Sequence, residues 1–267
     1  MTIWQSVIMG IVEGLTEFLP ISSTAHLILS SEILKIPTSE FLKTYSISIQ
    51  LGAIFAVVFL YWKKILSSKD LILKILCALL PTAIIGFAFY KIIKTYLMES
   101  LGLIAITLFL GGIAILLFEK IYKKKRSSSP AEAEDLTDEK LSYKQAFTIG
   151  VFQTLAMVPG VSRSAATIVT GLWLGLKRKT IIEFSFLLAI PTMAGATFLD
   201  LVKNKELILN LSQGDLISWV VGFILSFVTA IIGIKFLLRF IEKNNFIPFA
   251  WYRIALGLII GLVLMFS

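Results

Sequence analysis

The 267-residue sequence has few of the residues on which common catalytic and metal sites depend: it contains one cysteine and one histidine. The lone cysteine, Cys77, excludes an intramolecular disulfide and gives little support to a thiol mechanism. The sequence also lacks the phosphate-binding loop of nucleotide hydrolases, the His-Glu-x-x-His zinc motif and the Gly-x-Ser-x-Gly nucleophile motif. A functional site must therefore be built from other residue types.

Charged residues are also scarce, at 16% of the chain, whereas apolar residues make up 57% and the mean hydropathy is +0.88. Soluble domains contain roughly 45–50% apolar residues, and helices that are apolar all round need a very large core to bury them. Six apolar segments each have about the 20 residues of a membrane-spanning helix; they lie at about 41–62, 72–93, 99–121, 180–202, 215–238 and 247–266. This pattern predicts an all-α integral membrane protein.

The net charge of +8 comes mainly from lysines and arginines in short loops between these segments. Loops of this kind face the cytoplasm, so topology explains the charge and no nucleic-acid partner is expected. The basic loops lie near residues 62–74, 120–126 and 235–243, whereas residues 203–215 and the C-terminal end carry almost no net charge. Residues 1–20 lack a basic start and contain two glutamates, so we expect them to remain in the mature protein. Both termini are predicted to lie outside.

A polar segment at about 122–143 is predicted to be a cytoplasmic linker within a single membrane domain that spans residues 1–267. The segments on either side of it, about 1–121 and 144–267, are similar in sequence. Residues 10–25 align with 150–165, 140 positions later, and pair Ser22 with Ser162. Three predicted spans separate the two copies, and this odd number predicts an inverted-topology repeat with a site at the repeat interface.

Both copies are interrupted by proline, at Pro20 and at Pro159, which removes a backbone donor and clashes with the preceding helical turn. The pieces that follow, about 21–34 and 161–176, are too short to cross a bilayer at about 1.5 Å per residue. We therefore predict two re-entrant helical hairpins beside about six full transmembrane helices. Irregular backbone at that depth is tolerated only against protein or a watery cavity, which favours a shared active cavity.

The first hairpin carries polar residues that are costly in lipid and therefore indicate function. Glu13 and Glu17 are four residues apart and share a helical face, where carboxylates can bind a divalent cation, act as a general base or orient a histidine. Neutral, hydrogen-bonded carboxylic acids are the alternative. Three hydroxyl residues and the lone histidine follow at a helix start that favours an anion, although one serine there can simply be the N-cap; these residues are Ser22, Ser23, Thr24 and His26.

The second hairpin predicts a phosphate-binding site. Arg163 matches phosphate oxygens in a bidentate manner, Gly160 allows close backbone approach, and a helix start adds free N–H groups. The polar residues of this cluster are Gln153, Ser162, Arg163, Ser164 and Thr167. The alternative is an internal ion pair of Arg163 with Glu13 or Glu17, which an anionic ligand would open.

The segments Glu13-Gly-Leu-Thr-Glu-Phe-Leu-Pro-Ile-Ser-Ser-Thr-Ala-His26 and Pro159-Gly-Val-Ser-Arg-Ser-Ala-Ala-Thr167 together resemble the undecaprenyl-diphosphate phosphatases of the BacA type, and the resemblance covers essentially the whole chain. It implies a bacterial inner-membrane enzyme that hydrolyses undecaprenyl diphosphate to undecaprenyl phosphate and inorganic phosphate. This reaction recycles the lipid carrier for peptidoglycan synthesis and confers bacitracin resistance. Ala25 stands where the family commonly has glycine, a change that tightens packing without removing chemistry.

The resemblance and the two polar clusters together predict roles for particular residues. The catalytic group is Glu17, Ser23, His26 and Arg163, and the substrate-binding group is Glu13, Ser22, Thr24, Ser162, Ser164 and Thr167. Glu13 and Glu17 are candidate ligands for a divalent cation, Mg²⁺ or Ca²⁺. Ser23, His26 and water remain open as the nucleophile, and the oligomeric state remains open too.

Two other functions use the same residues differently. A polyprenyl-phosphate translocase would need the anion site but no nucleophile with its base, because broken helices near mid-membrane also serve alternating access. A non-catalytic membrane scaffold would need neither cluster except for stability. We favour the phosphatase.

Overall fold

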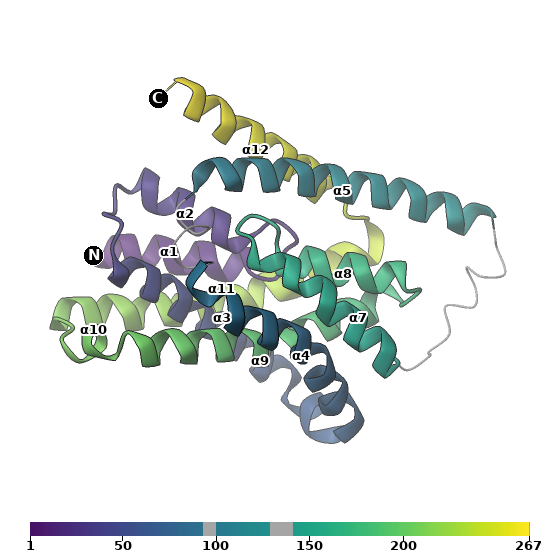
Figure 1. Ribbon diagram of the computed structural model, residues 1–267, viewed down its shortest axis with the longest axis horizontal. Coiled ribbons are helices and arrows are strands. Elements are labelled where there is room, and N and C mark those ends of the chain that lie inside the picture. Colours follow the sequence, from purple (N-terminus) through teal and green to yellow (C-terminus); the bar gives the residue numbers. More distant parts are fainter. Residues whose placement is uncertain (93–99, 129–140, 267) are drawn as a thin grey trace. The chain divides into compact units, whose positions relative to one another are not determined.

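The computed structural model describes residues 1–92, 100–128 and 141–266, and this part of the chain is helical with no strand (Figure 1). Six helices are long; their bounds are α3 Glu40–Ser67, α4 Lys69–Ile92, α5 Leu101–Ser128, α9 Arg178–Lys203, α11 Gln213–Lys243 and α12 Ile247–Phe266. The short helices are α1 Ile3–Thr16, α2 Ser23–Ile33, α7 Tyr143–Gln153, the 3₁₀ helix η2 Thr154–Met157, α8 Arg163–Trp173 and α10 Lys205–Leu209.

Each of the six long helices contains a stretch of 20 to 31 residues that is long and apolar enough to cross a membrane. They coincide with the six predicted spans, so the prediction of an all-α integral membrane protein is confirmed. Pro81 lies inside α4 and Pro191 inside α9. Proline within a spanning helix is tolerated because neighbouring groups satisfy the freed backbone carbonyls.

The predicted linker is helical at both ends. Helix α5 continues to Ser128, so the first residues of the segment at 122–143 are helical, and α7 begins at Tyr143. Residues 129–140 lie outside the described part of the chain. The boundaries of the single domain and of its two predicted repeats stay a prediction.

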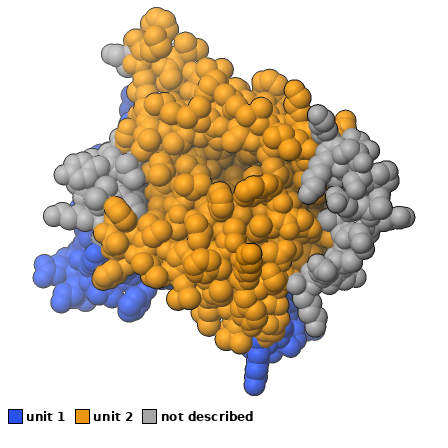
Figure 2. All heavy atoms as spheres, turned by 45° about the vertical axis from the view of Figure 1, so that its right-hand side comes forward, with its two compact units in different colours: residues 1–19, 23–69, 186–237 blue, residues 20–22, 70–185, 238–267 orange. Residues whose placement is uncertain are grey.

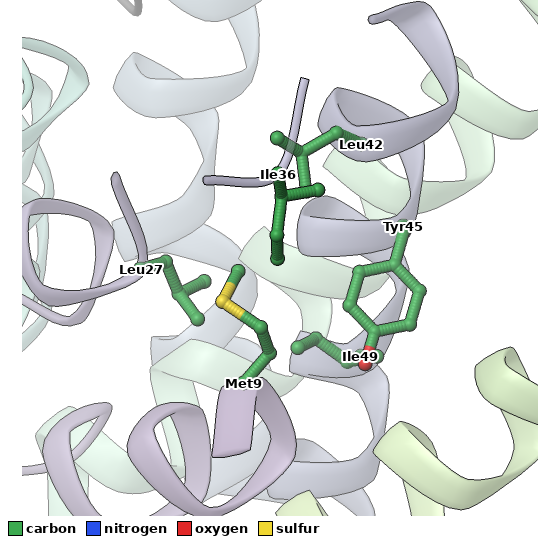
Figure 3. Close-up of a cluster of buried hydrophobic side chains, with 6 residues drawn as sticks. All are labelled: Met9, Leu27, Ile36, Leu42, Tyr45 and Ile49. Carbon is green, nitrogen blue, oxygen red and sulfur yellow. The ribbon is translucent and has the colours of Figure 1, made fainter. Parts of the chain in front are cut away.

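The chain divides into two compact units, coloured separately in Figure 2. Unit 1 comprises Met1–Leu19, Ser23–Lys69 and Phe186–Leu237, and unit 2 comprises Pro20–Ser22, Asp70–Ser185 and Leu238–Ser267. The core of unit 1 includes a cluster of buried apolar side chains from α1, α2, α3 and the segment between α2 and α3 (Figure 3). Its buried members are Met9, Leu27, Ile36, Leu42, Tyr45 and Ile49.

Helices α1 and α7 begin with the same capping device at equivalent positions. Thr2 accepts from the N–H of Gln5, whose side chain caps Thr2 in return, and Ser142 and Gln145 do the same 140 residues later. Such capping boxes satisfy backbone donors at a helix start. Both glutamines also donate at 3.2 Å to a carbonyl at the end of the short helix that follows, at Leu34 and at Leu174 respectively. Similar local sequences thus close two similar hairpins.

The first helix of each hairpin packs closely on a long helix from the other half of the chain. A Cβ atom on Gly10 of α1 would lie 2.6 Å from the carbonyl oxygen of Gly222 in α11, within unit 1. A Cβ atom on Gly150 of α7 would lie 2.0 Å from the carbonyl oxygen of Ala78 in α4, within unit 2. Glycine at these two equivalent positions therefore permits backbone contact between helices.

Candidate active site

Helix α1 ends at Thr16, four residues before Pro20, and a turn follows over residues 17–21. The break therefore precedes the proline itself, as expected when the proline ring excludes the helical conformation upstream. Glu17 caps the helix, and its N–H donates to the carbonyl of Glu13 at 2.9 Å. The two glutamates therefore leave the backbone one helical turn apart, as the sequence predicts. Glu13 is fully buried and Glu17 is nearly so.

Ser23, the first residue of α2, lies against Glu17. Its hydroxyl donates to Oε2 of Glu17 at 2.5 Å, and both side chains are 7% exposed. A hydroxyl within hydrogen-bonding distance of a carboxylate can act as a nucleophile with that carboxylate as its general base. This contact makes Ser23 a candidate for the reacting group.

The other residues of the first cluster lie close to Ser23 in the sequence. Thr24 and His26 lie on α2 and are half-buried, with His26 three residues after Ser23. Ser22 is buried and has φ of 72°, a conformation that is costly for a residue other than glycine. Ser22 belongs to unit 2, whereas the remainder of the cluster belongs to unit 1.

In unit 2, the equivalent position Ser162 also has φ of 72° and is the N-cap of α8. Its side chain accepts from the N–H of Ala165 at 3.2 Å, so part of its role is structural. Gly160, two residues earlier, has φ of 91° and lies so close to Thr107 that a Cβ atom would come within 1.9 Å of the threonine hydroxyl. The turn before α8 therefore requires glycine there.

Ser185 of α9 orients the arginine of the second cluster. Nη1 of Arg163 donates to the Ser185 carbonyl at 2.9 Å, and the Ser185 and Thr167 hydroxyls are hydrogen bonded at 2.7 Å. Thr167 and Ser185 are fully buried, as is Ser164. Ser185 was not among the predicted site residues, because it is a single serine within the apolar span 180–202, whereas the predicted residues form clusters of polar side chains.

Gln153 has a structural partner in unit 2. Its side-chain nitrogen donates to the Thr82 hydroxyl at 2.8 Å, and that hydroxyl donates to the Gly150 carbonyl at 3.2 Å. Gln153 occupies the position equivalent to Glu13 in the sequence alignment. These bonds tie α7 to α4.

Arg253 on α12 was not predicted either; it is fully buried and, within unit 2, donates to the main-chain carbonyls of Pro20 and Val161. A signal was present: an arginine within the predicted span 247–266 is an intramembrane charge, and such charges are usually functional.

The residues present fit a divalent cation only if substrate oxygens complete its coordination. In the described ranges, no group of three or more histidine, cysteine, aspartate and glutamate side chains could hold a metal ion. The buried carboxylates of Glu13 and Glu17 could supply part of a shell. Mg²⁺ is commonly bound through one or two carboxylates together with substrate phosphate oxygens. The donor set therefore suits an ion that binds with a diphosphate.

Comparison with known proteins gives one consistent family. The family described as Bacitracin resistance protein BacA matches residues 6–259 of this chain. The undecaprenyl-diphosphatase of Sulfurihydrogenibium sp. (strain YO3AOP1) is 51% identical over 97% of this chain and 98% of that protein. The undecaprenyl-diphosphatase of Wolinella succinogenes is 49% identical over 97% of each chain. That of Aquifex aeolicus is 45% identical over 100% of each.

Proposed function

The chain belongs to the bacitracin resistance protein BacA family, and from this premise we propose that it hydrolyses undecaprenyl diphosphate to undecaprenyl phosphate and inorganic phosphate. The family match and the names of the relatives support the substrate. The observation that carries the chemistry is the hydrogen bond from the Ser23 hydroxyl to Glu17. The pair supplies a nucleophile and a base in a membrane protein whose relatives are phosphatases.

In the first step, Ser23 Oγ attacks the terminal phosphorus and its proton passes to Glu17. The bond from that phosphorus to the bridging oxygen breaks, and undecaprenyl phosphate leaves with that oxygen. In the second step, water attacks the serine phosphate and gives a proton to His26. The Oγ–phosphorus bond breaks, inorganic phosphate leaves, and Glu17 returns its proton to Ser23. His26 then releases its proton to solvent, and the site returns to its starting state.

The second cluster binds the diphosphate and stabilises the charge that develops during transfer. Arg163 is suited to this task because Ser185 fixes its guanidinium and because guanidinium matches phosphate geometry. The start of α8 adds backbone N–H groups to the hydroxyls of Ser162, Ser164 and Thr167. Phosphoryl transfer depends mainly on such positioning and electrostatic stabilisation.

A divalent cation, Mg²⁺ or Ca²⁺, is proposed to bind with the substrate at Glu13 and Glu17. When bound, it would neutralise phosphate charge. The chain's own carboxylates would orient it, since Glu17 is fixed by Ser23 and Glu13 is enclosed by protein.

The basic loops support an orientation in the bacterial inner membrane with segment 122–143 in the cytoplasm and both termini outside. In this setting the reaction regenerates the monophosphate lipid carrier for peptidoglycan synthesis. Removal of the diphosphate form also accounts for bacitracin resistance, the property in the family's description.

The direct test is phosphate release from undecaprenyl diphosphate by detergent-purified protein, with lipid binding measured in parallel. We expect wild type to release phosphate and Ser23→Ala to bind the lipid without releasing phosphate. Binding without release by wild type would instead support lipid translocation.

A further inference from the structure

The guanidinium of Arg253 is fully buried, and all its hydrogen bonds go to main-chain carbonyls. Nη1 donates to Pro20 at 3.2 Å and to Val161 at 3.1 Å. Nη2 donates to Thr107 at 3.2 Å and to Gly160 at 2.9 Å. Within the described residues no carboxylate forms an ion pair with it, although buried charges are usually paired. The Arg253 guanidinium therefore donates four hydrogen bonds, all to backbone carbonyl oxygens.

Two of these carbonyls are equivalent in the two hairpins. Pro20 and Gly160 are 140 positions apart, and each lies two residues before a serine with φ of 72°, at Ser22 and Ser162. Such a conformation persists in a non-glycine residue only where the surroundings hold it. One side chain thus fixes both strained turns, each of which directly precedes a proposed reactive segment.

These bonds also orient backbone donors. All described peptide bonds are trans, so each N–H points opposite to the carbonyl of its own peptide group. Because the carbonyls of Pro20 and Val161 point to Arg253, the N–H groups of Ile21 and Ser162 point away from it. At Ser162 this donor joins the other backbone N–H groups at the start of α8, where the helix dipole favours an anion. Arg253 therefore helps aim the donors that an anion would use.

The surrounding chain is shaped to admit a planar guanidinium. A Cβ atom on Gly111 of α5 would lie 2.1 Å from Nη2 of Arg253. Thr107, one turn earlier on α5, donates from its hydroxyl to the carbonyl of Pro159 at 2.7 Å. A lysine at position 253 would keep the charge, but its compact ammonium has only three donors and cannot reproduce four bonds in a plane.

We propose that Arg253 is a positioning residue for the phosphatase reaction, which holds the turns before Ser23 and before Arg163 in their reactive conformations. This proposal rests on the proposed function. It concerns a residue that does not itself touch the reacting atoms. Loss of the guanidinium should loosen both turns together and slow catalysis more than it weakens substrate binding.

The test compares Arg253→Lys with wild type and with Arg178→Lys as a matched control. Arg178 is another arginine of unit 2; it is partly rather than fully buried, and its guanidinium bonds to the carboxylate of Glu119. Hydrogen exchange is measured in peptides that cover residues 17–25 and 157–165, and kcat and KM are measured per folded molecule. In Arg253→Lys we expect faster exchange in both peptides and a fall in kcat of about 100-fold, with KM changed less than about threefold, because displacements near 1 Å cost roughly this much. The control should change neither turn.

Gly111→Ala provides a second variant if Arg253→Lys fails to fold. Its methyl group displaces Nη2 and should reproduce the faster exchange at residues 157–165 with a smaller loss of kcat. Unchanged exchange in both turns, or full kcat in a folded variant, would overturn the proposal. If wild type releases no phosphate, the proposed function fails, and the exchange of the two turns alone decides whether Arg253 holds them.

Discussion

The hydroxyl of Ser23 donates a 2.5 Å hydrogen bond to Oε2 of Glu17, six residues earlier across the break between α1 and α2. The break brings the two residues together, since the turn at 17–21 reverses the chain before α2 starts. A carboxylate so placed can take the serine proton as the oxygen attacks phosphorus.

Glu17→Gln should lower kcat by about 100- to 10,000-fold, the usual contribution of a general base. The variant keeps the size of the side chain and a hydrogen bond to Ser23 but cannot take its proton. The double variant with Ser23→Ala should be no slower than Ser23→Ala alone, because the two residues act as a unit. Steady-state phosphate release measures both effects. Additive losses would show that Glu17 acts on something other than Ser23.

Arg163→Lys should reduce kcat/KM about 10- to 100-fold, since charge-assisted hydrogen bonds contribute about 1.5–3 kcal/mol and lysine lacks the planar fork. Arg239→Lys is the matched control, because Arg239 is exposed on α11. Equal activity of the two variants would remove Arg163 from phosphate binding.

Ser185→Ala should lower kcat/KM about tenfold, or roughly 1.4 kcal/mol. The change removes the hydroxyl that bonds to Thr167 and accepts a longer bond of 3.4 Å from Nη1 of Arg163, but it keeps the carbonyl that accepts from Arg163 at 2.9 Å. The expected effect is therefore smaller than that of altering Arg163 itself. Ser218→Ala, another fully buried serine, serves as the control. Kinetics and thermal unfolding should be measured on both, and a loss of stability without a loss of kcat/KM would count against an orienting role.

Gly150→Ala should destabilise the protein by about 1–3 kcal/mol, because the new methyl group would lie 2.0 Å from the Ala78 carbonyl oxygen. Gly195→Ala is the control: its Cβ atom would meet nothing within 4 Å, and alanine is favoured over glycine in a helix. Unfolding in detergent measures both. Equal stability of the two variants would contradict the close contact of α7 with α4.

A chelator should abolish phosphate release, and added Mg²⁺ or Ca²⁺ should restore it. Glu13→Gln should raise the concentration of metal ion needed for half-maximal activity, because it removes one of the two proposed carboxylate ligands. Activity that is unchanged by the chelator would refute the cation proposal and leave the roles of Ser23 and Glu17 intact.

Much of the fold follows from local sequence. The lengths of the apolar segments predict six spans, and the proline breaks predict two hairpins. The polar residues of both clusters are visible because a charge or a hydroxyl group is unusual in such segments. The repeated capping boxes of Gln5 and Gln145 show how short motifs fix equivalent geometry.

Tertiary contacts were harder to predict. The partners of Arg253 are carbonyl oxygens on residues 92 to 233 positions away, and a carbonyl carries no sequence signal. Ser185 belongs to the site only because it bonds to Arg163 and Thr167, and these contacts cannot be predicted from its own sequence position. The pairing of Glu17 with Ser23 depends on the path of the turn between them, which spacing alone does not give.

The most direct test of the account is a search for phosphate on Ser23. Wild type and His26→Ala would be mixed with undecaprenyl diphosphate labelled at the terminal phosphate, quenched rapidly and analysed by peptide mass spectrometry. We predict a labelled peptide phosphorylated at Ser23 that accumulates in His26→Ala, where the second step is slowed, and is absent from Ser23→Ala. If wild type releases phosphate but neither wild type nor His26→Ala carries label, the account is contradicted. That result would point to direct attack by water.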